Sequence, residues 1–178
     1  QASSIYAGTD QGGFYSCSKR AADDYVKEFY KSYNQNYTIL RYGSVYGPRS
    51  DKANGLRKII ERAIWQRKLI YMGNKKTIRK YVNVLDAAKA SVEILKDSYK
   101  NKSILLTGQK GEKISEVLKF LSKTLKINSK IIYKNEKKNK HYVIKPKPYL
   151  ITKVTEFKFN KIADFKKSIL SLIQELKY

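Results

Sequence analysis

The sequence predicts an α/β fold built around a largely parallel sheet. Short β-rich segments at 37–42 (YTILRY) and 103–107 (SILLT) are apolar enough to be buried strands, and segments with helical periodicity alternate with them. This alternation is typical of βαβ units, in which the strands run parallel. With 178 residues and 42% apolar content, the chain can bury one sizeable core, so we expect one compact unit or part of one.

The elements expected in the first half are a strand end that enters a loop within 1–8, a helix over 14–34 after the Gly12-Gly13 break, a strand over 37–42, a loop over 43–55 and a helix over 56–67. Those expected in the second half are strands over 69–72 and 81–84, a helix with Asp86 as N-cap running through Leu95, a strand over 103–107, a helix over 115–125, a strand over 131–133, a lysine-rich loop over 134–148 and a helix over 162–176. No internal repeat or sustained heptad interrupts this order.

The formal net charge of +23 raises the possibility of a nucleic acid or an anionic membrane as partner. Of the 38 basic residues, 31 are Lys and 7 are Arg, whereas proteins that read phosphates or bases favour the bidentate Arg fork. The lysines also occur on nearly every predicted polar face. We therefore interpret the charge as a lysine-rich background with solvated faces, and we expect no specific nucleic-acid partner.

Cysteine and histidine are scarce in this chain. The single cysteine, Cys17, excludes an internal disulfide, and one Cys with one His, His141, offers no metal site. A reducing cytoplasm fits this composition. No run of 18 or more apolar residues occurs, so we expect no membrane span.

Tyr15 and Lys19 form a YxxxK motif at the start of a predicted helix. Residues four apart lie on one helical face, so the phenol and the ammonium point into the same space. A phenol is a poor base at neutral pH, and a neighbouring positive charge stabilises its ionised form. The motif alone is also compatible with an exposed helix start.

Three further segments occur with the YxxxK motif in a fixed order: 3–8 (SSIYAG), 40–49 (LRYGSVYGPR) and 79–88 (RKYVNVLDAA). Together with 14–19 (FYSCSK), they resemble the SSxxVYG, YxxSK, LRxxNVYGPR and RxYIHVxDxA motifs of the extended short-chain dehydrogenase/reductase family, which includes NAD-dependent nucleotide-sugar epimerases and dehydratases. The resemblance covers residues 1 to about 110.

The resemblance implies a back part of a Rossmann-like parallel sheet plus a smaller α/β substrate-binding domain. Residues 1–45 would be the carboxy-terminal part of the NAD-binding domain. Residues 46–178 would mainly bind the substrate, with 81–107 returning strands to the Rossmann sheet. The chain begins at Gln1 and has no GxxGxxG fingerprint, since TGQKG at 107–111 lacks the required spacing. We therefore expect it to lack the amino-terminal cofactor-binding segment of a longer enzyme.

The resemblance also assigns roles to single residues. Tyr15 would be the general acid/base on the sugar hydroxyl, and Lys19 would hold the nicotinamide ribose. Tyr42, Gly43, Ser44 and Val45 would line the nicotinamide edge of NAD, a cofactor that the sequence does not separate from NADP. The nucleotide-sugar substrate would contact Ser44, Asn54 and Arg79, with Arg79 on the pyrophosphate. The full-length enzyme is expected to be a homodimer.

Some positions depart from the family pattern. The catalytic Ser or Thr of the family lies four residues before the tyrosine of VYG, which here is Ala2. Either Ser3 or Ser4 has shifted into this role, or the strand end is irregular. Ser44 replaces the family's Asn, Asn83 replaces its common His, and only 9 positions separate Tyr6 from Tyr15, which leaves a short loop.

The reaction predicted from these residues is epimerisation. Dehydratases of the family carry carboxylates at TDEVYG and decarboxylating members tend to carry a Glu there, whereas this chain has SSIY. Tyr15 would take the hydroxyl proton, hydride would move to NAD, the keto-sugar would turn over, and hydride would return to its other face. The nearest alternative is a keto-sugar reductase. An alternative of another class is a non-enzymatic basic module that binds nucleic acid or a protein.

Overall fold

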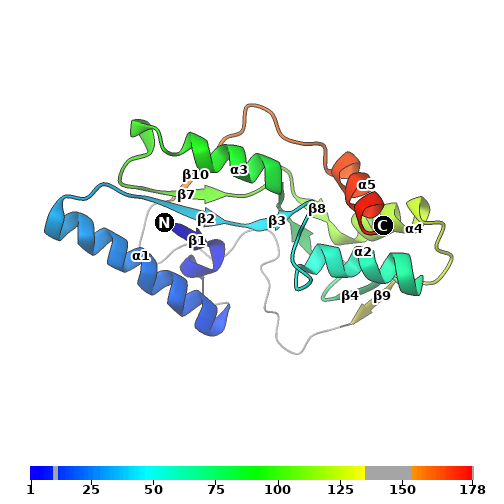
Figure 1. Cartoon of the computed structure of the whole chain (residues 1–178). Coiled ribbons are helices and arrows are strands. Elements are labelled where there is room, and N and C mark those ends of the chain that lie inside the picture. The colour runs from blue at the N-terminus through cyan, green and yellow to red at the C-terminus, as the bar shows by residue number, and fades with distance from the viewer. Residues whose placement is uncertain (10–11, 135–153, 178) are drawn as a thin grey trace.

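The computed structural model describes residues 1–9, 12–134 and 154–177 (Figure 1). Its largest sheet has four strands that all run parallel, in the order β1-β2-β7-β10. These strands are β1 (Ala2–Ser4), β2 (Thr38–Tyr42), β7 (Lys102–Leu106) and β10 (Thr155–Glu156). The predicted parallel α/β architecture is therefore confirmed.

Helices cover both faces of this sheet. α1 (Gly13–Tyr33) connects β1 to β2 on one face, and α3 (Val84–Glu93) lies on the other (Figure 1). Strands whose two faces are both covered by helices need apolar side chains on each face. On the side of α3, the strand residues pack with the helix in one buried cluster of Leu40, Val82, Ala87, Ala90, Ile94, Ile104, Leu106 and Phe157.

A second group of helices packs beside the sheet and has its own core. It consists of α2 (Gly55–Gln66), α4 (Ile114–Thr124) and α5 (Phe165–Glu175) (Figure 1). Each helix buries residues at helical spacing, as Val117, Leu118 and Leu121 do on α4. The parallel pair of β4 (Ile70–Met72) and β9 (Ile132–Lys134) packs against the same core.

Short elements join the two groups. β3 (Ser44–Tyr46) pairs in parallel with β6 (Tyr81–Asn83), and β5 (Ile78–Arg79) pairs antiparallel with β8 (Glu112–Lys113). Two 3₁₀ helices, η1 (Ile5–Gly8) and η2 (Asp97–Tyr99), complete the described elements. β3 lies inside the segment 43–55 that was predicted as a loop. That prediction was wrong because three residues between two glycines are too short to show a strand period.

The N-cap of α3 was also predicted wrongly. Asn83, not Asp86, caps the helix, because its side chain accepts a hydrogen bond from the Leu85 amide at 2.9 Å. Asp86 lies inside the first turn, where its Oδ2 accepts a hydrogen bond from the Ala163 amide at 2.8 Å. Both Asn and Asp are good caps, so composition alone does not separate them.

The remaining boundaries agree with the predicted elements to within about three residues. The lysine-rich loop expected over 134–148 starts at Lys134, the last residue of β9, and otherwise lies outside the described residues. His141 lies there too. Among the helices of the described part, none is both long and apolar enough to cross a bilayer.

Three aromatic side chains lie on the open side of α1. Tyr25, Phe29 and Tyr33 are 70%, 51% and 73% exposed. The buried residues of α1 are instead two polar ones, Ser16 and Asp23. The helix therefore meets the sheet through polar contacts and leaves an aromatic face uncovered in this chain.

A buried ion pair fastens α1 to β2. Arg41 Nη2 lies 3.0 Å from Asp23 Oδ2, and Arg41 Nε donates to the same oxygen at 3.1 Å. Only 3% of Arg41 and 1% of Asp23 is exposed, and Asp23 Oδ1 has no hydrogen-bond partner among the described residues. Each buried charge is tolerated because the other is present.

We expect Asp23→Ala to lower the free energy of unfolding by about 3–5 kcal/mol, because it leaves the charge of Arg41 buried and uncompensated. Urea denaturation followed by circular dichroism measures this change. The matched control is Asp24→Ala, whose exposed pair with Lys27 spans 3.0 Å and should contribute less than about 1 kcal/mol. Equal losses in the two variants would show that the buried pair does not hold the helix.

Candidate functional site

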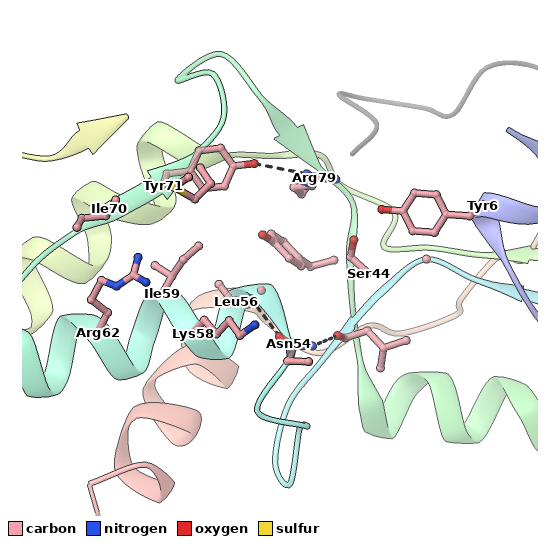
Figure 2. Close-up of a pocket in the computed structure, with 16 residues that line it drawn as sticks. Tyr6, Ser44, Asn54, Leu56, Lys58, Ile59, Arg62, Ile70, Tyr71 and Arg79 are labelled. Atoms are coloured by element: carbon pink, nitrogen blue, oxygen red, sulfur yellow. Dashed lines mark hydrogen bonds between the residues drawn. The ribbon is translucent and has the colours of Figure 1, made fainter. Parts of the chain in front are cut away.

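A cavity of about 590 Å³ lies where the main sheet meets the second group of helices. Residues from η1, the β2–β3 junction, the first two turns of α2, and β4, β5 and β6 line it (Figure 2). Among the predicted site residues, Gly43, Ser44, Val45, Asn54 and Arg79 line this cavity together, although they come from distant parts of the sequence.

Asn54 links the start of α2 to β3. Its Oδ1 accepts hydrogen bonds from the amides of Leu56 and Arg57, both at 3.1 Å, and its Nδ2 donates to the Val45 carbonyl at 2.9 Å. The side chain thus satisfies two of the amides that a helix start leaves unpaired. Asn54 fixes the position of the helix that forms one wall of the cavity.

The cavity wall on α2 carries positive charge. Asn54, Lys58 and Arg62 follow one another at four-residue spacing and lie on the side of α2 that faces the cavity (Figure 2). Arg57 differs, because its Nε pairs with Glu61 Oε1 at 2.7 Å. Among the described residues, none that lines the cavity is acidic. The arrangement suits an anionic ligand.

Arg79 supplies a third cation from the opposite wall (Figure 2). Its side chain is 6% exposed, and Nη2 donates to the Tyr71 hydroxyl at 3.5 Å. A guanidinium held in this way presents a planar set of donors that matches phosphate oxygens. Arg79 and the two cations of α2 therefore face each other across the cavity.

Gly43 joins β2 to β3 and lets the chain pass close to Thr107. Its amide donates to the Leu106 carbonyl at 2.9 Å, and a Cβ at this position would lie 2.8 Å from Thr107 Cγ2. Ser44 and Val45 follow directly and line the cavity. Tyr42 does not line it, because its hydroxyl lies 2.6 Å from Ser91 Oγ on α3.

Tyr15 and Lys19 lie side by side on α1. Lys19 Nζ is 5.9 Å from the centre of the Tyr15 ring and donates to the Ala2 carbonyl at 3.3 Å. Tyr15 is 52% exposed, so its phenol is accessible. The spacing of the YxxxK motif thus brings the two groups together, although neither lines the 590 Å³ cavity.

Ser3 and Ser4 have different surroundings. Ser4 Oγ accepts a hydrogen bond from the Tyr6 amide at 3.2 Å and caps η1. Ser3 is 4% exposed, and its Oγ has no hydrogen-bond partner among the described residues. Neither serine lines the cavity.

Aromatic packing supports the far wall of the cavity. Tyr81, which lines the cavity, stacks on Phe165 of α5 with ring centres 5.4 Å apart, and Tyr46 packs edge-on against both rings. Burial raises the pKa of Tyr46, so this phenol stays neutral at physiological pH. A neutral, packed cluster gives the wall a fixed position.

Four residues that were not predicted as site residues also line the cavity: Tyr6, Lys58, Arg62 and Tyr71. The four-residue spacing from Asn54 to Lys58 and Arg62 was a usable signal, because it places all three on one helical face. For Tyr6 the SSIYAG motif segment was a usable signal. Tyr71 reaches the cavity through tertiary packing, for which the sequence carries no local pattern.

Residues 6–106, more than half of the chain, match the NAD dependent epimerase/dehydratase family. The chain belongs to this family. A Methanocaldococcus jannaschii protein provisionally named a UDP-glucose 4-epimerase is 27% identical over 133 residues, which are 73% of this chain and 43% of that protein.

Two solved structures share the fold of this family member. One is a UDP-N-acetylglucosamine 4-epimerase from Methanobrevibacter ruminantium in complex with UDP-N-acetylmuramic acid, with a TM-score of 0.76 and 20% identity over 99% of this chain and 61% of that chain. The other is a dTDP-glucose 4,6-dehydratase from Bacillus anthracis in complex with NAD, with a TM-score of 0.77 and 19% identity over 99% of this chain and 60% of that chain. The chain thus spans about half of the length of these family members.

We expect Asn54→Ala to lower the free energy of unfolding by about 1–2 kcal/mol, because two amides of α2 lose their acceptor. Asn54→Asp keeps an acceptor for these amides and should recover most of the loss, although it removes the donor to Val45. Thermal unfolding of the two variants measures both effects. Equal melting temperatures for the Ala and Asp variants would mean that the capping bonds contribute little.

Proposed function

We propose that the enzyme containing this chain epimerises a nucleotide-activated sugar with NAD, through a transient keto-sugar. The proposal is carried by one observation: this member of the epimerase/dehydratase family has both a Tyr15–Lys19 pair on α1 and a cation-lined cavity. No acidic residue occurs in the described lining of that cavity. The similar M. jannaschii and M. ruminantium proteins are both named as 4-epimerases of UDP-sugars, which supports this choice.

Dehydration is the less favoured reaction. It needs an acid to protonate a leaving hydroxyl, and residues 3–6 (SSIY) offer no carboxylate. The cavity lining offers none either. Reduction of a keto-sugar uses the same Tyr–Lys pair and is the nearest alternative.

Tyr15 would act as the general acid/base on the sugar. Its accessible phenol would take the proton from the reacting hydroxyl and later return it. The positive charge of Lys19, beside the ring, would stabilise the negative charge on the phenol oxygen. Of the two serine candidates, we favour Ser3 as the accompanying hydroxyl, because Ser4 Oγ already caps η1.

The residues of this chain fit the nicotinamide end of NAD. An ammonium has three donors, and Lys19 uses one on the Ala2 carbonyl, which leaves donors for ribose hydroxyls. Gly43, Ser44 and Val45 would border the same end, with Tyr42 behind them. When bound, NAD supplies reversible hydride transfer; NADP would supply the same chemistry.

The substrate would lie in the 590 Å³ cavity. Its pyrophosphate would face Arg79 and the start of α2 at Asn54, where helix amides and cations favour negative charge. Ser44 would contact the sugar. In this arrangement residues 1–45 serve the cofactor and 46–178 mainly the substrate, with 81–107 returning strands to the main sheet.

We also propose a homodimer formed through α1. Its exposed aromatic face of Tyr25, Phe29 and Tyr33 is of the kind that another protein surface covers. We propose no specific nucleic-acid partner, because the basic residues are mostly Lys rather than Arg and several lysines form local pairs with neighbouring acids, as Lys31 does with Glu28. The exposed thiol of Cys17 is compatible with a cytoplasmic location.

Phe29→Lys should convert the dimer of the complete enzyme into a monomer, because it places like charges across the two-fold interface. Light scattering coupled to size-exclusion chromatography measures the mass. Val92→Lys is the control, since Val92 is a similarly exposed apolar residue on α3, at 69% exposure. An unchanged mass for Phe29→Lys would remove α1 from the interface.

Tyr15→Phe should lower the kcat of the complete enzyme by about 10² to 10⁴, because it deletes proton transfer and little ground-state contact. Arg79→Ala should mainly raise KM, since the phosphate contact exists in ground and transition states alike. Steady-state kinetics with UDP, dTDP, GDP and CDP sugars measure both. Unchanged turnover in Tyr15→Phe would refute the mechanism, and stoichiometric release of water would identify a dehydratase.

A further inference from the structure

The side chain of Tyr6 enters the cavity from the side of α1. Tyr6 belongs to η1 and is the residue of that turn that lines the cavity. Figure 2 shows its hydroxyl end pointing toward Ser44 and Arg79. Nothing in the YxxxK chemistry requires a second tyrosine here, so its placement calls for an explanation.

The backbone of Tyr6 is held on both sides. Its amide donates to Ser4 Oγ at 3.2 Å. Its carbonyl accepts from Ser16 Oγ at 2.6 Å and from the amide and hydroxyl of Thr9 at 3.0 and 3.2 Å. With both backbone groups bonded, the direction of the side chain is set before any ligand arrives.

The contacts that hold this turn come from the helix that carries Tyr15. Ser16 follows Tyr15 directly, and Arg20, one turn further on, donates to the carbonyls of Ala7 and Thr9, both at 3.0 Å. The positions of Tyr6 and Tyr15 are therefore fixed by one rigid unit.

Gly12 leaves room for the Tyr6 side chain. A Cβ at Gly12 would lie 3.2 Å from both Cβ and Cγ of Tyr6, closer than side-chain atoms normally approach. Gly12 also has φ +94, a conformation that glycine adopts without strain. Gly12 thus lies closely against Tyr6.

The location of Tyr6 indicates which part of a ligand it meets. The three cations Lys58, Arg62 and Arg79 line the cavity together with Tyr6. Tyr15 lies outside this lining, on the helix whose Ser16 donates to the Tyr6 carbonyl. A sugar that reached from a pyrophosphate at the cations toward Tyr15 would therefore lie beside Tyr6 on η1. A phenol can donate and accept a hydrogen bond, and its ring can cover the C–H face of a sugar.

We propose that Tyr6 binds the sugar ring of the nucleotide sugar, through a hydrogen bond from its phenol and contact with its ring. The assignment rests on the proposed function and adds a specificity residue to it. Tyr6 acts on the sugar alone, so it contributes nothing to the binding of a free nucleoside diphosphate.

The test compares two ligands by isothermal titration with the complete enzyme. UDP-, dTDP-, GDP- and CDP-glucose are first screened on the wild type, and the one that binds is used together with its nucleoside diphosphate. Tyr6→Phe should weaken binding of the nucleotide sugar by about 3- to 10-fold, the effect of one lost hydrogen bond, and leave diphosphate binding unchanged. Arg79→Ala should weaken both ligands.

Tyr30→Phe is the matched control, because Tyr30 lies far along α1, where its ring packs edge-on against Tyr37. It should bind both ligands as the wild type does. Unchanged affinity of Tyr6→Phe for the nucleotide sugar, or an equal loss for the nucleotide sugar and the diphosphate, would overturn the role of Tyr6 but not the proposed function. Failure of the wild type to bind any of the four nucleotide sugars would overturn the proposed function and the assignment with it.

Discussion

The arrangement of the site depends on how α1 is set against the sheet. Its inward face carries Ser16, Arg20 and Asp23, which are spaced as neighbours on one side of a helix. Apolar packing tolerates small rotations, whereas hydrogen bonds and ion pairs weaken steeply when their geometry changes. A polar inward face therefore fixes the rotation of α1 more narrowly than a leucine stripe. Because Tyr15 and Lys19 lie on the same helix, the rotation of α1 also fixes the direction of their side chains.

The sequence predicted the architecture because its strands and helices have strong periods. β2 and β7 appear as runs of buried apolar residues, and α4 and α5 as amphipathic helices. It did not predict β3, β5, β8 or β10, because two- or three-residue strands are defined by a partner rather than by a pattern. It also did not predict which side of α1 is buried, because the aromatic stripe there signals a helix but not what covers it.

The candidate site was predictable where a motif puts neighbours on one helix, as with Tyr15 and Lys19. Arg79, Ser44 and Asn54 line one cavity, and their contacts with a substrate stay a prediction. The direction of Tyr42 toward Ser91 on α3 and the different environments of Ser3 and Ser4 are consequences of tertiary packing. Tyr6 lies in one of the motif segments, but tertiary contacts direct its side chain into the cavity.

The cation-lined cavity has a consequence for how its ligands are measured. Lys58, Arg62 and Arg79 attract small anions, and no acidic side chain in the described part of the lining offsets them. Phosphate or sulfate in a buffer therefore competes with the ligand for the same donors, and added salt screens the attraction that draws the ligand in. An affinity determined in phosphate buffer is therefore an apparent affinity, because the ligand has to displace phosphate. The same titration in an amine buffer, whose acid is cationic and whose base is neutral, reports the affinity of the cavity without this competition.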